Sequence, residues 1–280
     1  MTSEMSLLYP EWQGYGENAC VFYGTTKLAD GLFGTEAFTV IEVAVREDLE
    51  TAEGVLGLRS IAPRFKSTLE RLRKVSPAKI FMIGGTCGAE AAPVGYLNER
   101  YDADLAVLWF DAHADLNTPQ SSPTGHFHGM VLRALLGEGP KEYVNELQCF
   151  LSPQQVFLIG TRDLDPPERV FISAANISIT TKLDNAISLV DEIRSRGFRQ
   201  VYLHLDLDIL NPHSFPNSLL RTPGGPTTAE LARVLATVAD SLEVVGFSVL
   251  EYCEHEDSSI ELVRELIKNS GITIACTRAL

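Results

Sequence analysis

Short apolar runs alternate with longer amphipathic stretches along the whole chain. Six runs rich in Val, Ile, Leu and Phe are nearly continuous, as expected for parallel strands buried on both faces. They span residues 38–45, 79–83, 105–110, 156–159, 201–207 and 244–250. Helices are predicted over residues 63–75, 88–100, 130–136, 184–196, 228–241 and 258–269. This alternation predicts an α/β fold with three α/β/α layers and a central parallel sheet, in one domain spanning residues 1–280.

Polar residues follow five of these apolar runs directly. The segments are IFMIGGTCGAE, VLWFDAHADLN, FLIGTRDLDP, VYLHLDLDILNP and VGFSVLEY. In open parallel sheets, ligands bind outside the carboxyl ends of the strands. Turns are polar in any protein, which explains the Gly and Asn residues. It does not explain Asp-x-His-x-Asp and Asp-x-Asp, because carboxylates that close would repel one another without a cation. We therefore expect a site at this edge of the sheet.

The two acidic motifs predict a metal centre. Asp111, His113 and Asp115 alternate in DAHAD, and Asp206 and Asp208 alternate in DLD. In an extended backbone, alternate residues share one face. Four carboxylates and one imidazole suit hard or borderline cations such as Mn²⁺, with Zn²⁺, Fe²⁺, Co²⁺ or Ni²⁺ as further options. One cation would leave surplus negative charge, whereas two cations about 3.5–4 Å apart would balance it. The alternative is a pair of solvated acidic loops.

Composition narrows the classes of partner. Lys and Arg total 23 against 37 Asp and Glu, so the formal net charge is −14. That balance argues against binding a nucleic acid backbone or an anionic membrane surface. No signal-peptide pattern opens the chain, and no apolar run approaches the roughly 20 residues of a membrane helix. The cysteines are not closely spaced and read as reduced thiols of a cytoplasmic protein: Cys20, Cys87, Cys149, Cys253 and Cys276.

The motifs resemble the arginase–agmatinase (ureohydrolase) family of binuclear manganese enzymes. The resemblance runs from about residue 80 to residue 251 and rests on Asp-Ala-His-Ala-Asp and on Asp-Leu-Asp, which a proline follows. It implies two Mn²⁺ ions per chain, a small guanidino substrate and a homo-oligomer. The ligands it implies are Asp111 and Asp206, which bridge the metals, Asp115 on one metal, and His113 and Asp208 on the other.

The resemblance extends to the substrate pocket and favours an arginase. In arginases an Asn and a hydroxyl residue hold the α-carboxylate of the amino acid, and the matching residues are Asn117 and Thr124. Asp165 matches the acid that receives the α-amino group, with Glu168 close behind, and Thr222 matches a residue that lines the pocket. Agmatine has no α-carboxylate, so an agmatinase has less reason to keep the Asn and Thr pair.

The same resemblance assigns the chemistry. His128 matches the catalytic histidine, and Glu251 matches the acid that pairs with the guanidinium, a planar and permanently charged group. Together with Asp115 they form the expected catalytic group. Water activated by the metals would attack the guanidino carbon that Glu251 orients. His128 would then help to protonate the leaving amine, and L-ornithine and urea would depart.

One position departs from the family pattern. Most relatives carry Gly-Gly-Asp-His after the first of these strands, and the His binds the first metal. Here Thr86 and Cys87 replace that Asp and His. Three outcomes stay open: Cys87 binds metal as a thiolate, the first metal is weak or missing and leaves one metal on Asp111, His113 and Asp206, or the protein is inactive.

The cysteine also bears on the substrate. A related hydrolase of Nω-hydroxy-L-arginine, which releases L-ornithine and hydroxyurea, shares this Thr-Cys pair but lacks the catalytic histidine, whereas this chain keeps His128. L-Arginine is therefore the first expectation and Nω-hydroxy-L-arginine the second. Two smaller departures are His204, where a small Ser is common, and Asn211. Both leave the hydrogen bonding around the metal ligands open.

Three further functions stay as alternatives: an agmatinase-like guanidinohydrolase, a zinc deacetylase-like enzyme and an inactive binding protein. Deacetylases of this kind share the fold and an Asp, His, Asp metal set, but characteristically carry two adjacent histidines, which this chain lacks. The number of bound metals separates the options. Two metals per chain support the hydrolase, one leaves a deacetylase-like or weakened site open, and none favours the binding protein.

Overall fold

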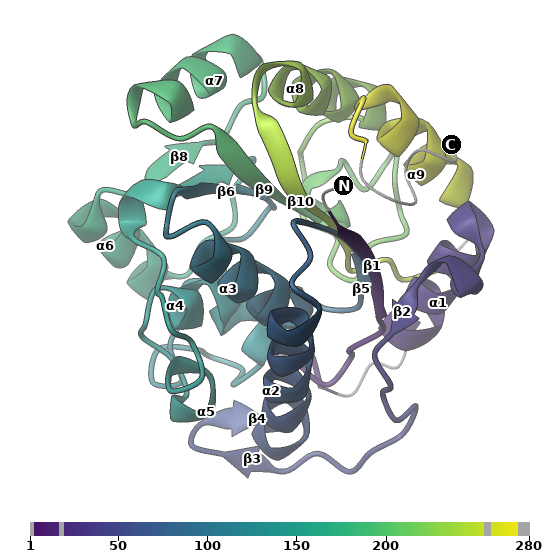
Figure 1. Cartoon of the computed structure of the whole chain (residues 1–280), viewed down its shortest axis with the longest axis vertical. Coiled ribbons are helices and arrows are strands. Elements are labelled where there is room, and N and C mark those ends of the chain that lie inside the picture. Colours follow the sequence, from purple (N-terminus) through teal and green to yellow (C-terminus); the bar gives the residue numbers. More distant parts are fainter. Residues whose placement is uncertain (1–2, 17–19, 255–258, 274–280) are drawn as a thin grey trace.

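The computed structural model describes residues 3–16, 20–254 and 259–273. Eight parallel strands form one sheet in the order β2-β1-β5-β10-β9-β6-β7-β8 (Figure 1). Their bounds are β1 Glu4–Tyr9, β2 Thr39–Val40, β5 Lys79–Gly84, β6 Leu105–Phe110, β7 Val156–Ile159, β8 Ser178–Thr180, β9 Gln200–Asp206 and β10 Glu243–Leu250. A separate antiparallel pair joins β3 (Thr51–Ala52) to β4 (Val55–Leu56).

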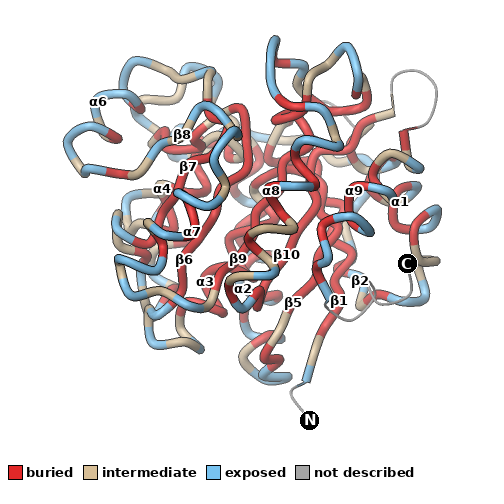
Figure 2. The backbone as a smooth tube through the Cα atoms, turned by 90° about the horizontal axis from the view of Figure 1, so that it is seen from above, coloured by how far each residue is buried: buried red, intermediate tan, exposed pale blue. Residues whose placement is uncertain are grey.

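Helices cover both faces of this sheet. One buried apolar cluster joins the sheet to α2 (Leu58–Val75), α3 (Ala91–Arg100), α4 (Val131–Leu135) and α6 (Pro166–Ala175). A second cluster joins the other face to α1 (Cys20–Phe33), α7 (Ala186–Ser195), α8 (Thr228–Ser241) and α9 (Ile260–Asn269). Figure 2 shows the buried strands between these partly exposed layers. The predicted three-layer α/β/α fold with a parallel sheet is confirmed.

The inner strands follow from their side chains. All six residues of β6 are buried, so apolar side chains cover both faces of the strand and no polar alternation is seen. The helix α8 begins where Thr227 and Glu230 form a capping box, which satisfies backbone N–H groups of its first turn. Among the described residues no helix is both long and apolar enough to cross a bilayer.

Some predicted elements differ from the structure. The run at residues 38–45 was predicted as a strand, but only Thr39–Val40 pair, because β2 lies at the sheet edge and contacts β1 alone. The predicted helix at residues 63–75 begins five residues earlier and contains Pro63. The sequence pattern also missed β1, β8, α1 and α6. The predicted helix at 258–269 begins at Ile260, and residue 258 lies outside the described residues.

Strand order explains why distant motifs meet. β10 lies between β5 and β9, and β9 lies beside β6. All four strands run in the same direction, so their carboxyl ends reach one edge of the sheet together. Cys87, Asp111 and Glu251 lie just after their strands, and Asp206 is the last residue of β9. The middle of the sheet therefore brings four sequence-distant side chains to one place.

Candidate metal centre and active site

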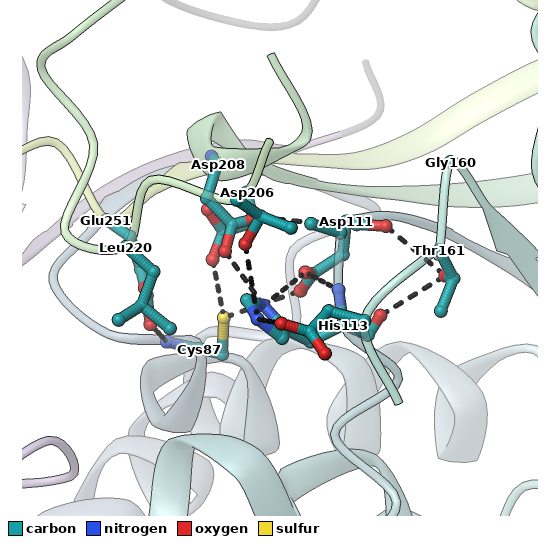
Figure 3. A network of polar contacts seen from close by, with 12 residues as sticks. Cys87, Asp111, His113, Gly160, Thr161, Asp206, Asp208, Leu220 and Glu251 are labelled. Carbon is teal, nitrogen blue, oxygen red and sulfur yellow. Dashed lines mark hydrogen bonds and ion pairs between the residues drawn. The ribbon is translucent and has the colours of Figure 1, made fainter. Parts of the chain in front are cut away.

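The predicted metal ligands converge at this edge of the sheet. Cys87 opens the 3-10 helix η2 (Cys87–Glu90), and its sulfur lies 3.0 Å from Asp206 Oδ2 and 3.8 Å from Asp111 Oδ2. His113 Nδ1 lies 2.8 Å from Asp208 Oδ2 and 3.5 Å from Asp111 Oδ1. Figure 3 shows the Cys87 sulfur directed at Asp206, with His113 close to Asp111 and Asp208.

The donor atoms fall into groups of the size that one cation needs. Cys87, Asp111, Asp115 and His204 each offer a donor within 4.8 Å of the others. A second group, of three residues, contains Asp111, His113 and Asp208, whose donors also lie within 4.8 Å of one another. Asp111 belongs to both groups, which suits a carboxylate that bridges two cations.

Unpartnered buried oxygens support this fit. Asp115 Oδ2 and Glu251 Oε2 are buried and have no hydrogen-bond partner. Burying a carboxylate oxygen without a partner costs free energy, and a bound cation removes that cost. The residues present therefore fit a pair of divalent cations, in agreement with the chemistry of the donor set.

Each acidic motif forms a local turn. Asp111 Oδ1 accepts a hydrogen bond from the His113 amide at 2.6 Å, and Asp206 Oδ1 accepts one from the Asp208 amide at 2.7 Å. These are Asx turns, in which a side chain bonds its own backbone two residues on. The motifs were expected in extended backbone, and that expectation is wrong beyond the strand ends. Turns, rather than a shared strand face, orient the carboxylates.

Two acids of the site adopt left-handed backbone. The φ angles of Asp115 and Glu251 are 53° and 59°, a region that residues other than Gly rarely occupy. The Asp115 carbonyl accepts hydrogen bonds from the amides of Leu132 and Arg133, at 3.1 and 3.2 Å. The Glu251 amide donates to the Gly85 carbonyl at 2.7 Å. These bonds stabilise a costly conformation at the site, as is common where function requires it.

Crowding shifts the acidity of these groups. Burial, followed by the charge of Asp111, raises the pKa of Asp115 well above its usual value and that of Asp208 to about 6. Burial and neighbouring carboxylates likewise raise the pKa of the Cys87 thiol. Burial alone would also raise the pKa of Asp111, but His113 and His204 lower it below its usual range. Cations that bind here must therefore displace protons.

Buried Glu251 pairs with partly buried His128 beside the candidate metal ligands. His128 Nδ1 lies 3.0 Å from Glu251 Oε1, which also accepts a hydrogen bond from the Cys87 amide at 3.2 Å. Burial would raise the pKa of Glu251, but the charge and hydrogen bond of His128 outweigh it and lower the pKa. Glu251 is therefore held as an anion, with its second oxygen unpartnered.

The predicted substrate-binding residues lie on neighbouring loops. Asn117 Nδ2 donates a hydrogen bond to Asp165 Oδ2 at 2.8 Å. The backbone N–H of Asn117 donates a second hydrogen bond to the carbonyl of Gly129, which follows His128. Thr124 lies exposed in the same loop as Asn117 and accepts a hydrogen bond from the amide of His126.

Thr222 and Glu168 lie close to these loops. Thr222 Oγ1 lies 3.5 Å from His113 Nε2, at the rim of the second donor group. Glu168 is buried, and its two oxygens accept hydrogen bonds from the amides of Leu116 and Asp165, both at 2.9 Å. Glu168 therefore positions Asp165 and the Asn117 loop through the backbone. A role in direct substrate contact stays a prediction for it.

Comparison with known proteins decides the family. The model of the arginase family matches residues 28–269, which is most of the chain. The chain belongs to the arginase family. The arginase of Staphylococcus aureus strain MRSA252 is 36% identical over 178 residues, which cover 61% of this chain and 59% of the relative. The arginase of strain COL is 33% identical over 198 residues, which cover 68% of this chain and 65% of that relative. The chain thus aligns with less than two thirds of these relatives.

Solved arginases share the fold over nearly the whole chain. The Entamoeba histolytica arginase, solved in complex with L-ornithine, superposes with a TM-score of 0.85 at 20% identity and covers 97% of this chain and 100% of its own. The Bacillus subtilis arginase superposes with a TM-score of 0.76 at 22% identity, covering 97% and 99%. The arginase-family resemblance and the fold expected from it are confirmed.

Glu11 is a residue of this arginase-family site that the sequence reading missed. It follows β1, is 2% exposed, and accepts hydrogen bonds from the Thr86 hydroxyl and from the Gly14 amide, the latter at 2.6 Å. A side chain at Gly85 would collide with the Glu11 backbone, so the glycine permits this close approach. Burial raises the pKa of Glu11. Glu11 therefore places a buried carboxyl group against Thr86, next to Cys87.

The cysteine prediction is wrong for one pair. Cys20 and Cys253 form a disulfide with a Cα–Cα distance of 5.5 Å, although 233 residues separate them in sequence. Sequence spacing alone does not report such long-range proximity. Cys87 and Cys149 are free thiols, and Cys276 lies outside the described residues. The expected cytoplasmic location stays a prediction.

Metal-dependent stability is expected to grow with pH. Between the ordinary pKa of 3.8 and about 6, Asp208 binds more protons in the folded metal-free protein than in the unfolded chain. The stability of the metal-free form should therefore fall as pH rises through that interval, whereas cation binding strengthens. A cation at about 100 times its Kd should raise Tm by on the order of 5 °C at neutral pH. Thermal unfolding measured with Mn²⁺ and with chelator, from about pH 5 to pH 7.5, checks this prediction. A metal-induced increase in Tm that is larger at low pH than at neutral pH would contradict it.

Proposed function

We propose that the protein hydrolyses L-arginine to L-ornithine and urea with a pair of divalent cations, of which Mn²⁺ is the expected ion. The observation that carries the proposal is the hydrogen-bonded pair of Asn117 and Asp165. The backbone N–H of Asn117 also donates a hydrogen bond to the carbonyl of Gly129, the residue after His128. An amide and a carboxylate at the site entrance suit the α-carboxylate and α-amino groups of an amino acid. Agmatine has no α-carboxylate and would leave the Asn117 amide without that partner.

The side chains divide the work of the reaction. The unpartnered Glu251 oxygen is placed to accept a hydrogen bond from the substrate guanidinium, which would take the place of His128 as its cationic partner. His128 is then free to donate a proton to the leaving amine. When bound, the cations supply Lewis-acid stabilisation and lower the pKa of water toward about 7. Asp115, held in its left-handed turn, would be one of the residues that hold a cation.

Nω-hydroxy-L-arginine is the second candidate substrate. The observation that favours it is Cys87, whose sulfur lies 3.0 Å from Asp206 at a position where most relatives have a histidine. The hydrolase of that substrate shares the cysteine. The presence of His128 beside Glu251 favours L-arginine over it.

Ornithine release from three substrates tests the proposal. Metal-loaded wild type is compared on L-arginine, Nω-hydroxy-L-arginine and agmatine, and the Cys87→His variant is measured alongside. We expect L-arginine to have the highest kcat/KM and agmatine the lowest. We also expect Cys87→His to change metal content and rates, because Cys87 lies among the metal ligands. Absence of ornithine release from both amino acids by protein that holds two metals would overturn the proposal.

A further inference from the structure

His204 is the one imidazole in the donor group that also contains Cys87, Asp111 and Asp115. It lies on β9, is fully buried, and its ring stacks on Trp109 of the neighbouring strand β6 with a centroid distance of 3.4 Å and an angle of 4°. This stacking fixes the plane of the imidazole. Its Nε2 atom lies 3.3 Å from Asp111 Oδ2 and 3.8 Å from the Cys87 sulfur. The outer edge of the ring therefore faces the metal ligands.

The other nitrogen of His204 faces a carboxylate. Nδ1 lies 3.4 Å from Glu90 Oε1, and Glu90 is itself fully buried and accepts a hydrogen bond from the Ser248 hydroxyl. The second oxygen of Glu90, Oε2, is also buried and has no hydrogen-bond partner. Histidines that bind metals usually donate the second ring N–H to a carboxylate, which fixes the tautomer and the ring orientation. Glu90 and His204 have this arrangement.

We propose that His204 is a direct ligand, through Nε2, of the first cation, and that Glu90 orients its ring. The inference rests on the proposed function only for the presence of divalent cations. With Cys87, Asp111 and Asp115, His204 completes a set of one sulfur, one nitrogen and two carboxylates, all within 4.8 Å of one another. That span is close to twice the metal–ligand distance of about 2.0–2.3 Å. The buried and unpartnered Asp115 Oδ2 points to the same cation independently of His204.

The donor set also determines which ion this position prefers. A thiolate and an imidazole favour borderline ions such as Zn²⁺ or Co²⁺ over Mn²⁺. The second group, Asp111, His113 and Asp208, offers no sulfur and suits a harder ion. The two positions therefore prefer different ions, and the position that contains Cys87 prefers the more thiophilic ion.

X-ray absorption of wild-type protein loaded with one equivalent of Zn²⁺ tests this without a variant. His113 belongs to the other group, so sulfur and imidazole on one zinc require both Cys87 and His204. We expect one sulfur at about 2.3 Å and one imidazole nitrogen at about 2.0–2.1 Å from the same ion. A sulfur shell without imidazole, or an imidazole shell without sulfur, overturns the proposal.

Cobalt titration of three variants gives a second test. Wild type should bind two Co²⁺ per chain and show a thiolate-to-cobalt charge-transfer band. His204→Ser should weaken one site by at least about 10–100-fold and alter the band, and Glu90→Gln should weaken the same site while the band remains. His213→Ser, which removes an exposed histidine, is the matched control and should bind as wild type does.

The outcome is independent of arginine hydrolysis. His204→Ser protein that binds both cobalt ions with wild-type affinity and spectrum overturns the proposal, whatever its activity. Retention of the second site in this variant serves as the check that it has folded. If cobalt binding behaves as expected but no guanidino substrate is hydrolysed, the proposed function fails and the assignment of His204 stands.

Discussion

Replacing His128 with Asn is expected to lower kcat for ornithine release by about 10²–10⁴-fold, which is the usual contribution of a positioned proton donor. The side chain is mostly buried, is edge-on to Tyr15, and is held by Glu251 at 3.0 Å. Asn keeps a polar group of similar reach but has no proton to give at neutral pH. The loss should therefore fall on kcat and leave KM nearly unchanged.

His126 supplies the matched control for that variant. It lies two residues earlier in the same loop, and its ring packs on Tyr15 with a centroid distance of 5.3 Å. His126→Asn removes an imidazole from the same neighbourhood without touching Glu251, so kcat should change little. Steady-state kinetics of both variants, with metal content measured in parallel, separates a lost proton donor from a disturbed loop. Equal losses in the two variants would contradict the role of His128.

Replacing Glu251 with Gln is expected to lower kcat/KM for L-arginine by about 10²–10⁴-fold, because removal of one partner from a buried charged pair costs about 3–5 kcal/mol. Glu251 is 1% exposed and presents one unpartnered oxygen beside the metal ligands. A neutral amide cannot form the charge-assisted bidentate pair that a guanidinium makes with a carboxylate. The pairing acts on substrate and transition state, so KM should rise as kcat falls.

Glu254→Gln is the control for this second prediction. Glu254 lies three residues further along the same segment and pairs with Lys27 at the surface. The same chemical change there should leave kcat/KM close to wild type. Glu251 also lies within ligand distance of Cys87 and Asp206, so metal content must be measured in both variants. Wild-type kcat/KM in a metal-replete Glu251→Gln protein would remove Glu251 from the mechanism.

The convergence of the candidate metal ligands could be predicted because they lie at the ends of strongly apolar strands. The runs before Asp111 and Asp206 leave little doubt about where each strand stops, and parallel strands end at one edge. Strand order was not predictable in the same way. Nothing local in the sequence says that the last strand, β10, inserts between β5 and β9.

The missed residues have separate physical causes. Glu11 was missed because the apolar run before it is short and β1 was not predicted, although the strand pairs with β5 over its full length. His204 was noted only as a departure, since its contacts depend on Trp109 of a neighbouring strand. The helix α6 after Asp165 was also missed, although Asp-Pro-Pro-Glu has the spacing of a capping box with proline in the first turn and could have indicated it.

The central place of β10 has a consequence for how the protein is made. Before residues 243–250 leave the ribosome, the sheet consists of two halves, β2-β1-β5 and β9-β6-β7-β8, each with an open edge where β10 will lie. Cys87 follows a strand of one half, whereas Asp111 and Asp206 follow strands of the other. The donor group that contains Cys87 therefore comes together only once β10 has joined the two halves, whereas Asp111, His113 and Asp208 lie on one half. Until then the two open edges are surfaces at which chaperones compete with aggregation.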